Sequence, residues 1–223
     1  IQYLVQAHSL PYAEFAILFR GNHQSRPLEK ELQLLKIPYH ITGGTAFLDR
    51  GEVKDVLAWL RVIANPDDDA AFLRAVTSPK REVGSTSLEK LAQLAHNAHV
   101  PLSLAAQNSS YMSALSARPA AGLAEFSRLI VKLRGQGKNG KAADIVRAVI
   151  NESGILAQLR LETKNEALFL RRKENLDELA QWFESERRPS GAGDLAAQLA
   201  LLSNADRGEP GNQVRLMSLH AAK

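Results

Sequence analysis

The chain has 223 residues, of which 45% are hydrophobic and 23% charged, proportions that are ordinary for a globular protein with a sizeable core. It has no cysteine, which excludes disulfides, thiolate metal sites and a cysteine nucleophile. It also has no apolar run of the roughly 20 residues that span a bilayer. No membrane partner is expected, and we predict a cytoplasmic protein. The formal net charge of +4 permits a polyanionic partner without requiring one.

The patterns between residues 16 and 44 are typical of a parallel α/β sheet. After a predicted helix over residues 1–8, the apolar run Ala16–Phe19 predicts a buried strand. A polar turn follows, Pro27 begins a helix that continues to about Leu35, and Tyr39–Thr42 predicts a second strand. In such sheets ligands bind where strands end and helices begin, so the polar turn is a candidate binding site.

A second strand-like apolar run lies near the end of the chain, at residues 214–219, and the pattern between the two regions is almost entirely helical. Val53, Val56, Leu57, Leu60 and Ile63 form an apolar stripe at helical spacing. Further helices are predicted near residues 69–76, 87–95, 101–108, 120–133, 142–153, 154–160, 167–186 and 194–202. We therefore predict a mainly α protein, in which a split α/β portion is interrupted by a large all-helical insertion.

One turn within the helical region has the chemistry of a phosphate contact. Two basic residues at 80–81 precede Gly84, and Ser85 or Thr86 is predicted to cap the next helix, with Glu89 completing a capping box. A glycine turn between two helices presents backbone amides to phosphate, as helix-hairpin-helix elements do on nucleic acid. A simple connector between helices is an equally good interpretation of this spacing.

The chain holds none of the common motifs that bind nucleotide or activate a nucleophile. No GxxxxGK[ST], GxSxG or HExxH motif is present, and the histidines do not fall at metal spacing. We expect no catalytic residue and no metal site, and Asp67 or Asp68 is interpreted as a helix cap. Residues 135–140 (GQGKNG) predict a flexible loop, and both Trp59 and Trp182 are predicted to anchor cores.

Several strings in the same order resemble a known family. They are ILFRGNHQSRPLEKEL, IPYHITGGTAFLDRGEVKDVLAWLRVIANPDDDAAFLRAV, SPKREVG and VRLMSLHAAK. Together they resemble the second half of the superfamily-one DNA helicases of the Rep, UvrD and PcrA group, and RGNHQSR and NPDDDAAFLR are most similar to its Rep branch. The likeness is dense over about residues 15–95 and again over 213–223.

The resemblance implies a domain layout and an activity. These helicases have two RecA-like motor domains with insertions, called 1A, 1B, 2A and 2B. The chain looks like a fragment with part of 2A at residues 1–48, the helical 2B insertion at 49–210 and a return into 2A at 211–223. The implied activity is ATP-dependent 3′-to-5′ translocation on single-stranded DNA and unwinding of duplex in replication or repair. ATP and Mg²⁺ would serve the intact enzyme, but their site lies outside this stretch, so no cofactor and no ATPase activity are expected of the fragment.

The resemblance also implies residues that contact DNA. The RxN element after the first strand, here Arg20 and Asn22, and the last motif, here Ser218 and His220, would touch the single strand, with serine in place of the usual threonine. The Gly-Ile-Gly hairpin of 2B, which contacts duplex backbone, falls on residues 82–84, where the first glycine is a glutamate. The residues that remain available for a duplex contact are Lys80, Arg81, Gly84, Ser85 and Thr86.

Two other functions stay open at this level. The helical insertion can be a non-motor module that binds duplex DNA or protein partners, including replication or repair proteins or a second protomer. A helix-hairpin-helix repair enzyme is a third class, but it needs a catalytic Asp or Lys after the hairpin, and no convincing residue is present. The resemblance places a hinge at the two crossings between 2A and 2B, residues 43–50 and 204–213.

Overall fold

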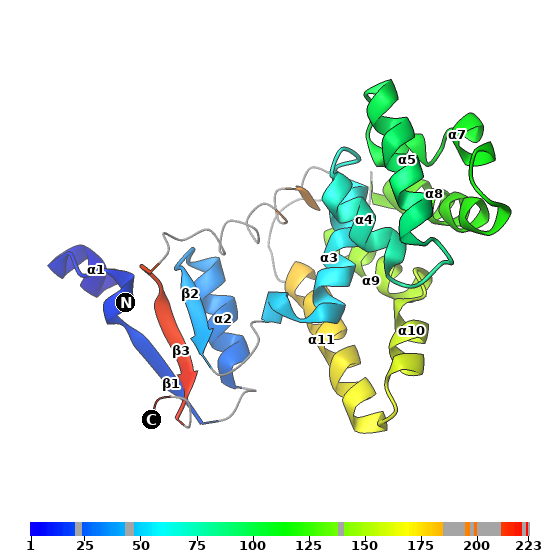
Figure 1. The fold of residues 1–223 in the computed structure, drawn as a ribbon. Coiled ribbons are helices and arrows are strands. Elements are labelled where there is room, and N and C mark those ends of the chain that lie inside the picture. Colours follow the sequence, from blue (N-terminus) through cyan, green and yellow to red (C-terminus); the bar gives the residue numbers. More distant parts are fainter. Residues whose placement is uncertain are drawn as a thin grey trace. The chain divides into compact units, whose positions relative to one another are not determined.

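The computed structural model describes residues 1–20, 24–42, 47–137, 141–184, 195, 196, 199, 211–219 and 222. The chain divides into two compact units, one formed by Ile1–Arg50 with Gln198–Lys223 and the other by Gly51–Ala197. The second unit is therefore inserted, in sequence, between the two parts of the first. Figure 1 labels the helices and strands of each unit.

The first unit is built on a three-stranded parallel sheet with the order β1-β3-β2. β3 lies in the middle although it comes from the far end of the chain; it pairs with β1 in the register Phe19↔Ser218 and with β2 in the register Tyr39↔Val214. The predicted parallel sheet is confirmed. The elements of this unit are α1 (Gln2–His8), η1 (Tyr12–Glu14), β1 (Ala16–Phe19), α2 (Ser25–Leu34), β2 (Tyr39–Thr42), η3 (Phe47–Asp49) and β3 (Val214–Ser218).

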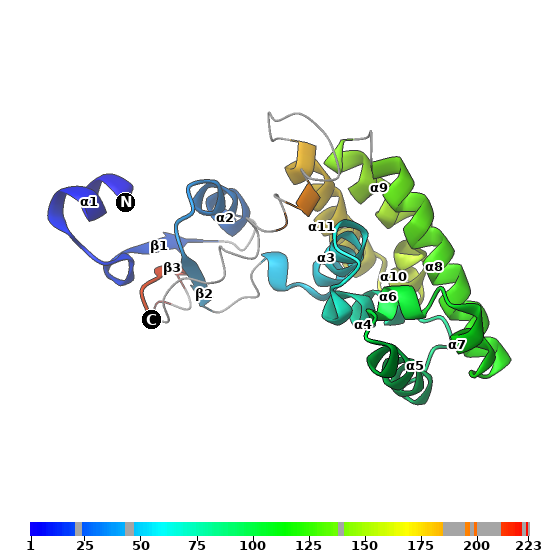
Figure 2. The same cartoon turned by 90° about the horizontal axis from the view of Figure 1, so that it is seen from above.

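Helix α2 buries one face of this sheet (Figure 2). Phe19, Val214 and Leu216 form a buried cluster with Leu32 of α2 and with Ile37, which precedes β2. Burying each of these side chains contributes about 1.5–3 kcal/mol. Because neighbouring residues of a strand point to opposite faces, Leu18 and Arg215 lie on the other face, where both are exposed.

The second unit is entirely helical in the part that the structure describes. Its central helix is α3, which contacts α4, α8, α9, α10 and α11. The predicted stripe is confirmed for Val53, Val56, Leu60 and Ile63, which are all buried, while Leu57 is half-buried. The helices are α3 (Gly51–Ala64), α4 (Asp69–Thr77), α5 (Ser85–Ala98), α6 (Leu102–Ala105), α7 (Ser109–Ser113), α8 (Ala117–Gly137), α9 (Ala142–Glu152), α10 (Ile155–Glu162) and α11 (Glu166–Glu184).

An aromatic cluster joins three helices of this unit. Trp59 of α3 meets the edge of Phe126 of α8, with ring centroids 4.8 Å apart, and Phe126 meets Phe72 of α4 at 5.4 Å. All three rings are fully buried, and edge-to-face pairs add about 0.5–1.5 kcal/mol each beyond the area that they bury. Trp59 is therefore the predicted core anchor, whereas Trp182 is only half-buried.

Two local predictions were wrong. The N-cap of α5 is Gly84, which makes no side-chain cap bond, so the predicted capping box does not form. The GQGKNG segment is not all loop, because α8 continues through Gly137. A Cβ at Gly137 would lie 2.7 Å from the side chain of Ile145, so glycine is retained there for close packing against α9 and not for chain flexibility.

The described chain is thus mainly helical, with one small parallel sheet, as predicted. Asp68 caps α4 by accepting a 2.9 Å hydrogen bond from the amide of Ala71, which confirms one of the two predicted caps. Among the described residues, no helix combines the length and the apolar character needed to cross a membrane.

Candidate nucleic-acid interface

Arg20 and Ser218 lie together at the carboxyl edge of the parallel sheet. Ser218 is the last residue of β3 and pairs with Phe19, and the amide of Leu219 donates a 2.9 Å hydrogen bond to the carbonyl of Phe19. Arg20 follows directly, exposed, with its amide donating to the side-chain oxygen of Gln24 at 2.9 Å. Two of the four residues predicted to bind the single strand are therefore neighbours at the edge where α/β sheets bind ligands.

The other two predicted residues, Asn22 and His220, lie outside the described residues, and so do residues 43–46 of the first predicted crossing and 204–210 of the second. Their contact with DNA and the hinge stay predictions. In the sequence, Asn22 follows Arg20 by two residues and His220 follows Ser218 by two.

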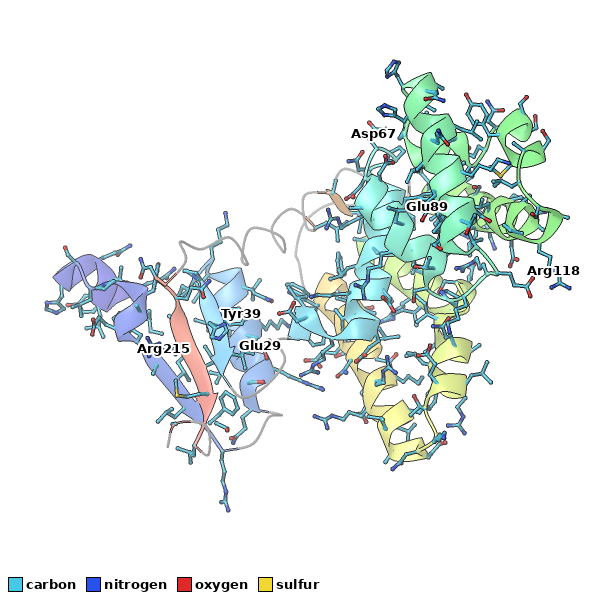
Figure 3. The ribbon with its side chains drawn as sticks, in the orientation of Figure 1. Glu29, Tyr39, Asp67, Glu89, Arg118 and Arg215 are labelled. Atoms are coloured by element: carbon cyan, nitrogen blue, oxygen red, sulfur yellow. The ribbon has the colours of Figure 1, made fainter. Side chains whose placement is uncertain are left out.

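A buried carboxyl group supports the first unit behind this edge. Glu29 of α2 is 2% exposed and accepts hydrogen bonds from the Ser25 hydroxyl at 2.9 Å and from the amide of Phe47 at 2.8 Å. Figure 3 labels Glu29 on α2 beside Tyr39 of β2, whose hydroxyl donates a 3.4 Å hydrogen bond to Glu29 Oε2. Glu29 was not predicted from the sequence, although the i, i+4 spacing of Ser25 and Glu29 indicates that the two side chains can meet on one face of a helix.

The turn between α4 and α5 exposes the groups that the sequence predicts for a duplex contact. Lys80, Gly84, Ser85 and Thr86 are all exposed. The first hydrogen bonds of α5 are donated by the amides of Ser87 and Leu88 to the carbonyl of Gly84, each at 3.1 Å. The amides of Ser85 and Thr86 therefore precede the helical ladder and point out of its positive end, where an anion is stabilised.

Within the part of the chain that the structure describes, no contact requires glycine at position 84. Its backbone is extended, with φ −87° and ψ 170°, and a Cβ built on it meets no atom within 4 Å. A missing side chain at an exposed helix end lets another molecule approach the backbone closely. By contrast, Glu82 has φ +57°, in the left-handed region that favours glycine, and this is the position where the resemblance expects glycine.

Arg81 differs from its neighbours because its side chain turns inward. Its guanidinium donates hydrogen bonds to the carbonyls of Pro79 at 2.8 Å and Ser153 at 2.7 Å. It also lies over two aromatic rings, 4.8 Å from the centroid of Trp59 and 5.5 Å from that of Phe126. These carbonyl oxygens and ring faces are partners of its charge, and the side chain is half-buried, so we do not assign Arg81 to a direct contact with DNA.

Burial lowers the pKa of Arg81 to about 10, and the nearby Glu125 carboxylate opposes that shift by favouring the charged form. The guanidinium is therefore still charged at neutral pH. A charge in this position needs the carbonyl oxygens and ring faces around it, because an unpaired buried cation is costly.

Among the described residues, no three His, Asp or Glu side chains gather closely enough to hold a metal, and the sequence has no phosphate-binding loop of the GxxxxGK[ST] type.

The sheet unit thus carries Arg20 and Ser218 at its carboxyl edge, and the helical unit exposes the first amides of α5. A model of the UvrD-like helicase C-terminal domain matches residues 1–223, and the chain belongs to this family.

Its relatives include named helicases. The chain is 35% identical over 221 residues to the ATP-dependent DNA helicase Rep of Escherichia coli (strain K12), covering 95% of this chain and 33% of that protein. It is 35% identical over 221 residues to the ATP-dependent DNA helicase PcrA of Bacillus subtilis (strain 168), covering 95% and 30%. DNA helicase II of Escherichia coli is 36% identical over 218 residues, covering 95% and 30%. The chain thus spans about a third of the length of these relatives.

Proposed function

We propose that the chain forms part of an ATP-dependent 3′-to-5′ DNA helicase that translocates on single-stranded DNA and unwinds duplex in replication or repair. The division at Arg50 and Gln198 supports assigning the sheet unit to domain 2A and the helical unit to domain 2B. ATP and Mg²⁺ are assigned to residues beyond those of this chain. The proposal places the protein with the DNA, in the cytoplasm.

The observation that carries the proposal is that Arg20, which follows Phe19, and Ser218, which pairs with Phe19, lie at one edge of a parallel sheet in a chain of this family. We assign Arg20 to a phosphate of the single strand and the Ser218 hydroxyl to a hydrogen bond with the same strand. Asn22 and His220 complete the proposed set. Arginine suits this role because its planar fork matches phosphate oxygens and its charge persists at any working pH.

Replacing Arg20 with alanine is expected to weaken the binding of single-stranded DNA by about tenfold, the usual effect of losing one charge-assisted hydrogen bond. The slope of log affinity against log salt should fall in magnitude by about one. Fluorescence anisotropy with a labelled oligonucleotide measures both quantities. Arg215→Ala is the matched control, because this exposed arginine sits on β3 (Figure 3), pairs with Ala16 at the far end of the strands, and should leave the affinity unchanged.

Equal affinities of the Arg20 and Arg215 variants would remove Arg20 from the strand. The carboxyl edge of a parallel sheet also binds nucleotides. If single-strand affinity were unchanged and ATP hydrolysis by a full-length relative carrying the matching substitution were lost, the phosphate that Arg20 binds would belong to the nucleotide.

We assign the duplex contact to Lys80, Gly84, Ser85 and Thr86 of the helical unit. Lysine supplies a mobile charge, and the first amides of α5 supply directed donors, so together they recognise backbone phosphate without reading base sequence. Glu82 brings a carboxylate close to the same place, which weakens the contact relative to a chain with glycine there.

A second candidate function for the helical unit is a contact with another protein. Leu161 at the end of α10 is 86% exposed, and Leu168 and Leu170 at the start of α11 are 49% and 47% exposed. Exposed leucines on two consecutive helices favour a protein surface over DNA. The partners considered are a replication or repair protein and a second protomer. Comparing pull-down by the Leu161→Glu variant with pull-down by the unaltered chain tests whether these leucines contact a protein.

A further inference from the structure

The turn that carries the proposed duplex contact is fixed by other helices of its unit. We call residues 78–84 the 78–84 loop. At its start, the Trp59 indole donates a 2.7 Å hydrogen bond to the carbonyl of Ser78. Further along, the amide of Lys80 donates to the side-chain oxygen of Gln158 of α10 at 2.6 Å. The backbone from Ser78 to the amide of Lys80 is therefore held by residues outside the loop.

The Arg81 side chain makes several further contacts that hold the loop. Its guanidinium closes the loop on itself through the carbonyl of Pro79 and ties it to the end of α9 through that of Ser153. The planar group also covers the edge-to-face pair formed by Trp59 and Phe126. Only a planar fork with several donors can make all of these contacts at once, and lysine cannot replace it.

Helix α8 contacts the same loop from behind at a position where only glycine fits. A Cβ on Gly122 would lie 2.3 Å from the carbonyl oxygen of Arg81 and 3.1 Å from a methyl group of Val83. The first contact is with backbone, so an alanine at this position must displace the loop. Gly135, in the same helix, has no atom within 4 Å of the corresponding Cβ.

We propose that Arg81 is a positioning residue of the duplex contact, and that with Gly122 it sets where Lys80 and the first amides of α5 are presented. This inference rests on the proposed duplex contact of the 78–84 loop. Arg81 acts through its neighbours and does not itself touch DNA. The helix end and its lysine are thereby preorganised, so binding loses little entropy in ordering them.

The Arg81→Lys variant separates this role from a direct phosphate contact. A lysine keeps the positive charge and would preserve most of a phosphate contact, whereas it cannot hold the two carbonyls and two rings. We expect about tenfold weaker duplex binding for Arg81→Lys, with little change in single-strand binding. Near-unaltered duplex affinity would overturn the proposal.

The second pair of variants contains no change of charge. Gly122→Ala is expected to weaken duplex binding to a similar extent as Arg81→Lys, and Gly135→Ala is the control that should bind as the unaltered chain does. Because both changes act on one loop, the double variant should bind only as weakly as the weaker single variant. Additive losses would indicate a direct contact of Arg81 and would contradict the proposal.

Circular dichroism at the assay temperature identifies any variant that does not fold. If a variant does not fold, Gln158→Ala keeps the test decisive. Gln158 is half-buried, and its replacement removes the hydrogen bond to the Lys80 amide without touching the core. We expect a several-fold loss of duplex affinity, and unchanged affinity would count against a positioned loop.

The outcomes also distinguish failure of the proposed duplex contact from failure of the positioning role of Arg81. If the unaltered chain binds no duplex, or if Lys80→Glu changes nothing, the proposed contact itself fails. If Lys80→Glu weakens binding but folded Arg81→Lys and Gly122→Ala do not, only the positioning role fails.

Discussion

Replacing Glu52 with alanine is expected to lower the free energy of unfolding of the helical unit by about 3–4 kcal/mol. Glu52 is 5% exposed, near the start of α3. It accepts hydrogen bonds from Asn175 at 2.6 Å and from the Arg172 guanidinium at 3.0 Å, both on α11. Alanine leaves the buried amide of Asn175 without this acceptor and Arg172 without this carboxylate. The partial exposure of Arg172, whose side chain is 26% accessible, keeps the cost below that of a fully buried unpaired charge.

Urea unfolding followed by circular dichroism measures this effect. Glu52→Gln is the matched control, because it preserves the acceptor for Asn175 while removing the charge, and it should lose about half as much stability or less. A Glu52→Ala variant as stable as the unaltered chain would mean that the contact between α3 and α11 does not depend on this carboxylate.

Replacing Glu29 with alanine is the second large effect, expected to destabilise the sheet unit by about 2–3 kcal/mol. Two buried or partly buried donors, the Ser25 hydroxyl and the Phe47 amide, lose their acceptor. Hydrogen exchange measured by mass spectrometry locates the effect, since faster exchange should be confined to peptides of the sheet unit. Gln33→Ala is the control, because this residue donates to the Tyr39 hydroxyl from a less buried position. Equal exchange in the Glu29 variant and the unaltered chain would contradict the prediction.

In the sequence, Glu29 and Glu52 lie on either side of the boundary between the two units, which falls between residues 50 and 51. Glu29 holds the amide of Phe47 within the first unit, and Glu52 holds α3 to α11 within the second. Each unit thus fixes its own end of the connection, and we expect each substitution to destabilise its own unit.

The regular elements could be predicted because their signals are local. The apolar run at Ala16–Phe19 and the stripe from Val53 to Ile63 follow from the periods of strands and helices, and the structure has both elements. Pairing of β3 between β1 and β2 is a contact between residues about 200 positions apart. No pattern within either segment specifies that pairing, although the strand-like run at residues 214–219 already predicted that the α/β portion is split.

The functional side chains were predicted less completely because burial depends on the whole unit. Arg81 in a basic turn looks like an exposed phosphate contact, and only the packing of α3, α8 and α9 shows that it is half-buried and bonded within the protein. Gly122 gave no signal, since its role depends on the carbonyl of Arg81 beside it. The missing capping box has the same origin: α5 begins at Ser85, two residues before the predicted start at residue 87, because the carbonyl of Gly84 already accepts the first helical bonds.

The most direct test of the account is a salt titration of duplex binding by this chain, with single-stranded and junction DNA in parallel. We predict binding to duplex that weakens steeply with salt, is reduced about tenfold by Lys80→Glu, and is tightened several-fold by Glu82→Gly, which removes a carboxylate and suits the left-handed backbone. Absence of binding to any DNA at low salt, or binding that neither variant alters, would contradict the assignment of the helical unit to duplex DNA.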